Sequence, residues 1–233
     1  TAQEQAIFAQ RPAASLAWYR SWLAGGLLAS QQDKLLASLC RPDRLLELVR
    51  FYTYSDSKHG KIVARYQQVF GIRALIARIQ QRDVRGARQG GVIWHTTGSG
   101  KSITMLLLAK ALIFHPELQN CRVLVITDRT DLEAQLSKTF ASAGVLTARD
   151  QQEALSQSGR HLAQQIGKGT ARVMFSLIQK FNSAAKLPEC RNDSSDFIVL
   201  VDEGHRSQGG ENHVQMRLAL PNAAFVAFTG TPL

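Results

Sequence analysis

Two kinds of hydrophobic pattern divide the sequence near Gly90. From there onward, short runs of consecutive apolar residues alternate with longer segments whose apolar positions recur at helical spacing. The runs predict strands at Val92–His95, Val123–Thr127, Arg172–Phe175, Phe197–Asp202 and Ala224–Phe228. The segments between them predict helices at Lys101–Phe114, Asp131–Phe140, Glu153–Ile166, Ser176–Phe181 and His213–Leu218. Strands that are apolar on both faces and alternate with helices are typical of an α/β fold, in which helices cover both faces of a parallel sheet.

The first part of the chain has a different pattern. Residues 1–52 predict several short helices, one of which begins at Arg41–Asp43. The polar stretch Thr53–Gly60 predicts a loop or linker. Ile62–Gln81 predicts an amphipathic helix with arginines on its polar side, and Arg82–Gln89 predicts a basic loop. We therefore expect a small helical segment before the α/β domain.

Composition narrows the class of protein. The chain has 233 residues, of which 45% are hydrophobic, so it can bury a sizeable core and is not a disordered or collagen-like chain. No apolar run reaches the roughly 18 residues that a membrane span needs, and no signal-peptide pattern is present. Cys40, Cys121 and Cys190 are far apart, which argues against a disulfide scaffold and a cysteine zinc site. The expected location is the reducing cytoplasm.

The formal net charge of +10 is concentrated at the start of the chain. Residues 1–89 carry 14 basic and 6 acidic side chains, and the segment Lys61–Arg88 alone carries seven basic residues and one acidic residue. A polyanion is a reasonable partner for such a surface, because neutralising phosphates releases counterions. A solvated helix face explains the same charges, so charge alone leaves both interpretations open.

The strongest chemical signal is Gly98-Ser99-Gly100-Lys101-Ser102, which follows a predicted strand and opens a predicted helix. This is the context of a phosphate-binding loop, in which glycines let backbone amides wrap the phosphates at the positive end of a helix. Lys101 would lie against the β- and γ-phosphates, and the Ser102 hydroxyl would ligate Mg²⁺. His95 stands where the usual pattern begins with glycine. The alternative is an ordinary glycine-rich turn without a ligand. Lys101 and Ser102 at these two positions argue against that alternative.

Two later segments could complete such a site. Asp202 and Glu203 follow the apolar strand Phe197–Val201, where a phosphate loop needs an aspartate to hold its metal and a general base to polarise water. His205 lies in the same segment. Thr229-Gly230-Thr231 follows the last predicted strand and could relay the state of the nucleotide. Acidic pairs and small turns are common in proteins and alone indicate little. These two segments follow later strands of the same predicted sheet, and this placement favours a role in a nucleotide site.

A glutamine pair lies upstream of the loop, in Arg65-Tyr66-Gln67-Gln68. A glutamine amide can donate a hydrogen bond to adenine and accept one from it at the same time. A position on the surface of a helix is the alternative interpretation.

Taken in order, these segments resemble the motor domain of superfamily 2 helicases, and more closely the restriction (R) subunit of type I restriction-modification enzymes. The resemblance covers about residues 61–233, and residues 1–60 are similar to a helical connector before the motor. It rests on five blocks, Trp94–Ser102, Val125–Leu132, Ile178–Phe181, Asp202–Gln208 and Phe228–Leu233. His95 in place of glycine is usual in that family.

The resemblance implies a RecA-like P-loop fold that uses ATP and Mg²⁺ to translocate double-stranded DNA, with cleavage far from the recognition site and with methylation (M) and specificity (S) subunits as partners. By position, Gln67 (or Gln68) would read adenine. Asp128, Arg129, Gln179 and Lys180 would face the DNA backbone. His205, Thr229, Gly230 and Thr231 would couple hydrolysis to movement.

We expect the second motor lobe and the nuclease to lie outside these residues. Such a lobe would supply an arginine that stabilises the transition state, so the chain alone should bind ATP weakly, hydrolyse it slowly and not translocate. Two alternatives stay open at this stage. One is a lobe of another superfamily 2 helicase or remodeller, and the other is a non-catalytic nucleic-acid-binding module.

Overall fold

The computed structural model describes residues 40–56, 60–96, 98–202 and 211–230. The chain divides into two compact units, Thr1–Glu47 and Leu48–Leu233. In the first unit the described residues contain the beginning of helix α4 (Pro42–Phe51), which starts at the proline that the sequence indicated. The second unit contains the sheet and all the candidate site residues. Within the described residues, no helix has the length and apolar character needed to cross a membrane.

A parallel sheet of five strands forms the centre of the second unit. Its strands run in the order β3-β7-β6-β4-β5, and every neighbouring pair is parallel. They are β3 (Gly91–Trp94), β4 (Arg122–Thr127), β5 (Val173–Leu177), β6 (Phe197–Asp202) and β7 (Ala224–Thr229). All five predicted strands are therefore confirmed, and so is the parallel α/β architecture.

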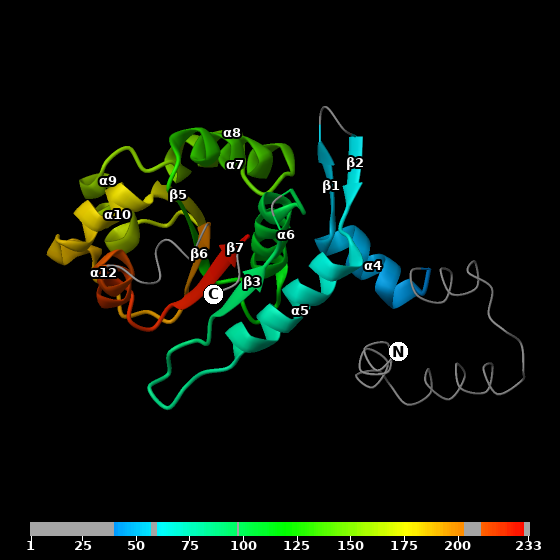
Figure 1. Cartoon of the computed structure of the whole chain (residues 1–233), viewed down its shortest axis with the longest axis horizontal. Helices are drawn as coiled ribbons and strands as arrows, with labels where there is room; N and C mark the ends of the chain where they lie inside the picture. The colour runs from blue at the N-terminus through cyan, green and yellow to red at the C-terminus, as the bar shows by residue number, and fades with distance from the viewer. Residues whose placement is uncertain (1–39, 57–59, 97, 203–210, 231–233) are drawn as a thin grey trace, which may run out of the picture. The chain divides into compact units, whose positions relative to one another are not determined.

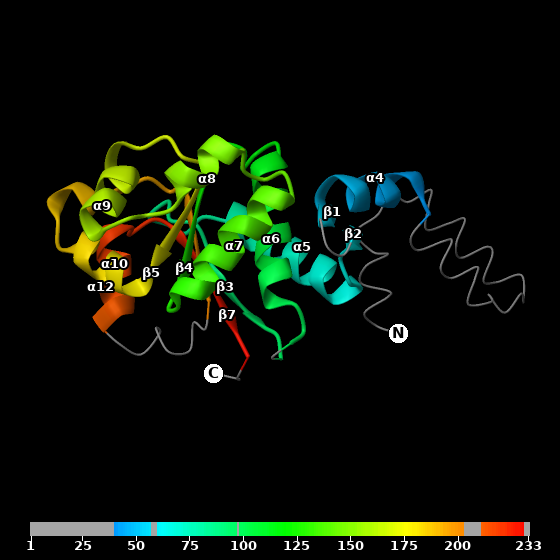
Figure 2. The ribbon, with the colours of Figure 1, turned by 90° about the horizontal axis from the view of Figure 1, so that it is seen from above.

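Helices cover the sheet on both sides, as Figure 2 shows. One side carries α5 (Tyr66–Gln80), α6 (Lys101–Phe114), α7 (Thr130–Ser142) and the short α8 (Ala148–Ala154). The other side carries α9 (Gly159–Lys168), α10 (Ile178–Ala185) and α12 (Glu211–Ala219), with a 3-10 turn at Pro188–Cys190. Each layer has its own hydrophobic cluster against one face of the sheet.

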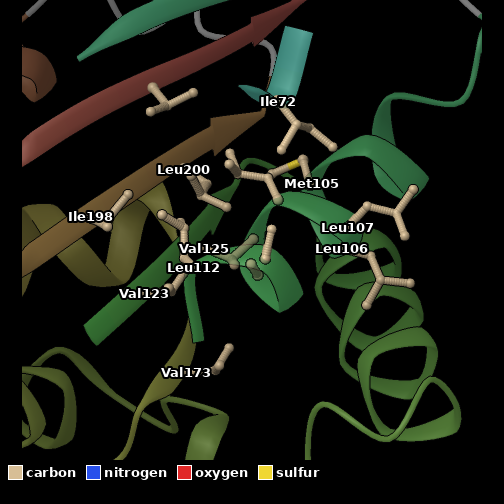
Figure 3. Close-up of a cluster of buried hydrophobic side chains, with 14 of the residues drawn as sticks. Ile72, Met105, Leu106, Leu107, Leu112, Val123, Val125, Val173, Ile198 and Leu200 are labelled. Carbon is tan, nitrogen blue, oxygen red and sulfur yellow. The ribbon is translucent and has the colours of Figure 1, made fainter. Parts of the chain in front are cut away.

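Helix α6 is the best-buried helix next to the site. Met105, Leu106, Leu107 and Leu108 are all fully buried, so the helix is enclosed on every side rather than on one stripe. Figure 3 shows its side chains among those of β4, β5 and β6 and of Ile72 from α5. This enclosure fixes the position of the amino end of α6, where the candidate phosphate loop joins it.

Four segments differ from the sequence prediction. Thr53–Gly60 was expected to be a loop, but β1 (Thr53–Asp56) pairs antiparallel with β2 (Gly60–Val63), so the expected domain boundary after residue 60 falls inside a strand. The helix expected at Ile62–Gln81 begins only at Tyr66, because Ile62 and Val63 belong to β2. The single helix expected at Glu153–Ile166 is two helices, α8 and α9. The helix expected to begin at Ser176 begins at Ile178 instead, because β5 continues to Leu177.

Candidate nucleotide and nucleic-acid site

The candidate phosphate loop joins β3 to α6. Gly98 and Gly100 have φ angles of +79° and +94°, a conformation that residues with a side chain rarely adopt. Both the amide and the hydroxyl of Ser99 donate to the carbonyl of Thr96, at 3.1 and 2.6 Å. The dipole of α6 favours an anion at its amino end, which this loop adjoins. The described residues of the loop therefore include the positive-φ glycines that the predicted phosphate-binding loop requires.

His95 connects the loop to the neighbouring strand. Its amide donates to the carbonyl of Thr229 at 2.9 Å, which extends the pairing of β3 with β7 by one residue. Its Nδ1 lies 3.5 Å from the hydroxyl of Thr104 on α6. Burial, and then the positive charge of Lys101, lower the pKa of the His95 imidazole. Both effects favour the neutral form of the imidazole.

Asp202 reaches the same edge of the sheet as the phosphate loop. It pairs with Phe228 of β7, which in turn pairs with Ile93 of β3. Because the strands are parallel, all three end at one edge, with β7 between the other two. Strand spacing places β3 and β6 roughly 10 Å apart. The two elements that the sequence predicted to form one site are therefore brought to one edge.

The coupling candidates are only partly described. Thr229 is buried at the end of β7, and the carbonyl of Gly230 accepts a hydrogen bond from the Trp94 indole at 3.3 Å. Both therefore lie between the phosphate loop and Asp202. Glu203, His205 and Thr231 lie outside the described residues.

The described residues at this edge include oxygen donors of the kind that magnesium binds. Among the described residues, no group of three or more His, Cys, Asp or Glu side chains could hold a metal. Mg²⁺ keeps several waters and is held by one or two carboxylates together with substrate phosphates. Asp202, at the end of β6, and Ser102, in the first turn of α6, are oxygen donors of the required kind.

The structure distinguishes the two glutamines. Gln68 is buried, and its side-chain nitrogen donates to the carbonyl of Gly100 at 3.3 Å and to the hydroxyl of Thr104 at 3.0 Å. Its side-chain oxygen accepts from the amide of Arg65 at 2.9 Å. Gln67 is exposed on the same helix. Gln68 therefore ties α5 to the phosphate loop, a contact that the sequence did not reveal, and Thr104 is a member of the site that sequence reasoning missed.

Two of the candidate DNA-binding side chains are exposed. Arg129 follows β4, is two-thirds exposed, and makes two hydrogen bonds to the carboxylate of Asp131 at 3.2 and 2.6 Å. The arginine is the main cause that lowers the pKa of Asp131. Gln179 is exposed in the first turn of α10, just after β5. Asp128 lies in the turn before α7. These residues stand at the same edge of the sheet as the phosphate loop, because their strands are parallel to β3.

Lys180 is held within the protein. Its ammonium group contacts both carboxylate oxygens of Glu133 at 3.2 and 3.3 Å and donates to the carbonyl of Ser156 at 2.5 Å. The two side chains are only 24% and 9% exposed. Lys180 therefore joins the first turn of α7, which begins just after Arg129, to the first turn of α10, which carries Gln179.

Comparison with known proteins identifies the family. The family model of the SWI2/SNF2 ATPase matches residues 67–233. The chain belongs to the SWI2/SNF2 ATPase family. The region of the chain that matches the family model begins at Gln67 and includes the phosphate loop, Asp202 and the segment after β7.

The resemblance to type I restriction subunits is also confirmed. The chain is 39% identical over 222 residues to the type I restriction enzyme HindI endonuclease subunit of Haemophilus influenzae, covering 86% of this chain and 21% of that protein. It is 33% identical over 207 residues to a putative type I restriction enzyme endonuclease subunit, MjaIXP, of Methanocaldococcus jannaschii, covering 86% and 19%. The chain thus spans about a fifth of the length of these relatives.

Solved structures support the fold. The UvsW helicase of bacteriophage T4 superposes with a TM-score of 0.55 at 18% identity, covering 82% of this chain and 60% of that chain. The SWI2/SNF2 ATPase core of Sulfolobus solfataricus, solved in complex with double-stranded DNA, superposes with a TM-score of 0.52 at 11% identity, covering 79% and 34%. The RecA-like, helicase-type fold is therefore confirmed.

Proposed function

We propose that this chain is the ATP-binding motor lobe of a type I restriction R subunit. In this role it drives ATP-dependent translocation of double-stranded DNA, which leads to cleavage distant from the recognition site. The observation that carries the proposal is the common edge of the sheet at which Gly98–Ser102 and Asp202 both lie. The restriction-subunit relatives support this choice over other helicase branches.

Each residue at this edge has a defined role in the proposal. The amides of Gly98 and Gly100 and the ammonium group of Lys101 bind the phosphates, and Ser99 shapes the loop around them through its two hydrogen bonds to the Thr96 carbonyl. Ser102 and Asp202 hold Mg²⁺, which when bound neutralises charge that develops on the phosphates. Glu203 orients and polarises the attacking water as a general base. The carboxylate and the loop can share one nucleotide because they lie at one edge.

Adenine recognition is assigned to the exposed Gln67. The amide of Gln68 already has partners on the phosphate loop and its helix, which leaves Gln67 as the glutamine whose amide faces solvent. Gln68 then keeps the loop and α5 together while the nucleotide is bound.

We also assign DNA binding and coupling to residues of this edge and of the segments that follow its strands. Arg129 and Gln179 contact the DNA backbone, and Lys180 orients α7, which follows Arg129, and α10, which carries Gln179. Thr229, Gly230, His205 and Thr231 pass the state of the nucleotide to a second motor lobe. In a protein of the relatives' length, the second lobe, the nuclease and the contacts to M and S subunits belong to other parts of the molecule, so the chain alone hydrolyses ATP slowly and does not translocate.

The direct test is nucleotide affinity. Replacing Lys101 by alanine removes the ammonium group at the β- and γ-phosphates, so the affinity for a fluorescent ATP analogue with Mg²⁺ should fall at least tenfold. Lys138→Ala, which removes an exposed lysine on α7, is the matched control and should leave the affinity unchanged. Asp202→Asn should weaken the dependence of binding on Mg²⁺. Unchanged affinity in Lys101→Ala would refute the assignment of the phosphate loop.

A further inference from the structure

The carbonyl of Gly100 accepts hydrogen bonds from three donors behind the phosphate loop. The amide of Thr104 donates at 2.9 Å and the hydroxyl of Thr104 at 3.1 Å, both from α6. The side-chain nitrogen of Gln68, from α5, donates at 3.3 Å. Figure 1 shows α5 and α6 beside β3, and the two helices contact each other. The carbonyl is therefore held from two separate helices.

This carbonyl belongs to the peptide that joins Gly100 to Lys101. A peptide is planar, so holding its carbonyl fixes the orientation of the whole plane. The amide of Gly100 and the ammonium group of Lys101, both assigned to the phosphates, precede and follow this peptide along the chain. Glycine adopts positive and negative φ angles with similar ease, so Gly98 and Gly100 do not fix the loop by themselves. The contacts on the Gly100 carbonyl are what hold the two phosphate-binding groups in one relative position.

The donors and acceptors around Thr104 determine where its proton lies. The Thr104 side chain is fully buried, and a hydroxyl can donate one hydrogen bond and accept two. The side-chain oxygen of Gln68 accepts from the amide of Arg65 at 2.9 Å, so its nitrogen faces Thr104, at 3.0 Å, and can only donate. The Gly100 carbonyl can only accept. The hydroxyl proton therefore goes to Gly100, and one lone pair accepts from Gln68.

His95 is the third neighbour of this hydroxyl. Its Nδ1 lies 3.5 Å from the Thr104 oxygen, whose remaining lone pair can accept from it. Since the hydroxyl proton is already directed to Gly100, Nδ1 carries the ring proton. The amide of His95 donates to the carbonyl of Thr229. The hydrogen-bonded set thus extends from α5 through α6 to the end of β7.

We propose that Thr104 is a positioning residue of the phosphate loop. Its hydroxyl fixes the Gly100–Lys101 peptide in the orientation that binds phosphates, and His95 directs the hydroxyl toward Gly100 by donating from Nδ1. A loop that is already ordered loses less conformational freedom when it binds a ligand, so this contact raises the affinity for nucleotide. The proposal rests on the nucleotide site proposed above.

The alternative is an ordinary contact within a helix. A threonine hydroxyl can donate to the carbonyl four residues earlier, and Thr139 of α7 donates to Gln135 in this way at 2.8 Å. Thr104 differs because its hydroxyl also accepts from Gln68 on another helix. Its acceptor, Gly100, also precedes the helix and belongs to the loop. Thr139 is therefore a matched control for the helical contact alone.

Nucleotide affinity is the first measurement. Thr104→Val keeps the shape of the side chain and removes the hydroxyl, so the affinity for the fluorescent ATP analogue with Mg²⁺ should fall about tenfold. Thr104→Ser keeps the hydroxyl and should bind the analogue within about twofold of the wild type. Thr139→Val removes the matched hydroxyl of α7 and should leave the affinity unchanged.

Two NMR measurements on the ligand-free chain test the geometry without nucleotide. The order parameter of the Gly100 amide should fall in Thr104→Val and keep its wild-type value in Thr104→Ser and Thr139→Val. The ¹⁵N chemical shifts of the wild-type His95 ring should be those of the Nδ1–H tautomer at about pH 8, above the ordinary imidazole pKa of about 6.5. The tautomer measurement needs no variant, so it tests the proposal even if Thr104→Val does not fold.

The outcomes separate the positioning role from the motor function. An Nε2–H tautomer in the wild type overturns the role of the hydroxyl, and so do equal affinity losses in Thr104→Val and Thr104→Ser. Unchanged affinity in Thr104→Val, when Lys101→Ala binds the analogue more weakly, also overturns it but leaves the motor function standing. Unchanged affinity in Lys101→Ala refutes the phosphate loop, and the proposal for Thr104 with it.

Discussion

Replacing Lys180 by methionine separates a DNA contact from a role in positioning. The Lys180 ammonium group contacts the Glu133 carboxylate and the Ser156 carbonyl, in a site that is 24% exposed on the lysine side and 9% on the glutamate side. Breaking a fully buried ion pair lowers the free energy of unfolding by about 3–5 kcal/mol, and breaking an exposed pair lowers it by about 0–1 kcal/mol. Because this pair is partly buried, we expect a loss of about 2 kcal/mol in the free energy of unfolding. In a domain of this size that corresponds to a fall in Tm of roughly 4–8 °C. Glu133→Gln should cause a similar fall.

The salt dependence of DNA binding provides the decisive assay. Each phosphate contact contributes about 0.9 to the slope of log K against log salt concentration. Arg129→Ala should therefore reduce the slope by about that amount, with Tm unchanged, because its ion pair with Asp131 is exposed. Lys180→Met should lower the affinity and Tm while leaving the slope unchanged. If Lys180→Met reduced the slope as much as Arg129→Ala and kept its Tm, the lysine would contact DNA and the positioning role would be refuted.

Three further predictions concern the candidate site and its supports. Gly90→Ala would place a Cβ 1.9 Å from the Phe225 carbonyl oxygen of β7, so the free energy of unfolding should fall by on the order of 2 kcal/mol or more and Tm should fall with it. Gly71→Ala, whose Cβ would have no atom within 4 Å, should be neutral or stabilising in the same melt. Gln68→Leu removes three hydrogen bonds, so it should lower the free energy of unfolding by about 2–3 kcal/mol and also weaken ATP binding. Gln67→Leu should weaken ATP binding and leave Tm unchanged. Burial is the main cause that lowers the pKa of His95 in the folded protein. The stability that the neutral imidazole contributes is therefore present above the pKa of the unfolded chain, about 6.5, and is lost as pH falls. The Tm difference between wild type and His95→Asn should narrow when the pH is lowered from 7.5 to 5.5.

The α/β core could be predicted because its local signals agree. Helix α6 was predicted with its observed bounds, since two glycines precede it and His115-Pro116 follows it, and the residue before a proline disfavours helix. The strands β4, β6 and β7 are runs of buried apolar residues that no helix of that length would produce. In these segments the pattern, the length and the flanking residues all indicate the same element.

Segments whose structure depends on distant partners were predicted less well. Leu155 looks like one more apolar position of a long helix, but it forms a bridge to Phe175 of β5, and the hydroxyl of Ser158 then caps α9 by accepting from the amide of His161 at 3.1 Å. The polar run Ser156–Ser158 was the local signal for this break. Likewise, the polar stretch after Phe51 forms a hairpin because it pairs with β2, a contact that the polarity of the stretch does not indicate.

In the candidate site, the positions that follow from sheet topology could be predicted, and the side-chain orientations that depend on helix packing could not. A parallel sheet brings the residue after every strand to one edge, so the order of segments along the chain was enough to place the phosphate loop, Asp202 and Arg129 together. Whether a side chain at that edge points outward depends on the helices packed beside it. Lys180 and Glu133 are 47 residues apart, and Gln68 meets Gly100 across two helices. No local pattern distinguishes Lys180 from Gln179 or Gln68 from Gln67, because each pair differs by one helical position, which is a rotation of about 100°. That rotation separates a residue that can meet a ligand from one that holds the site together.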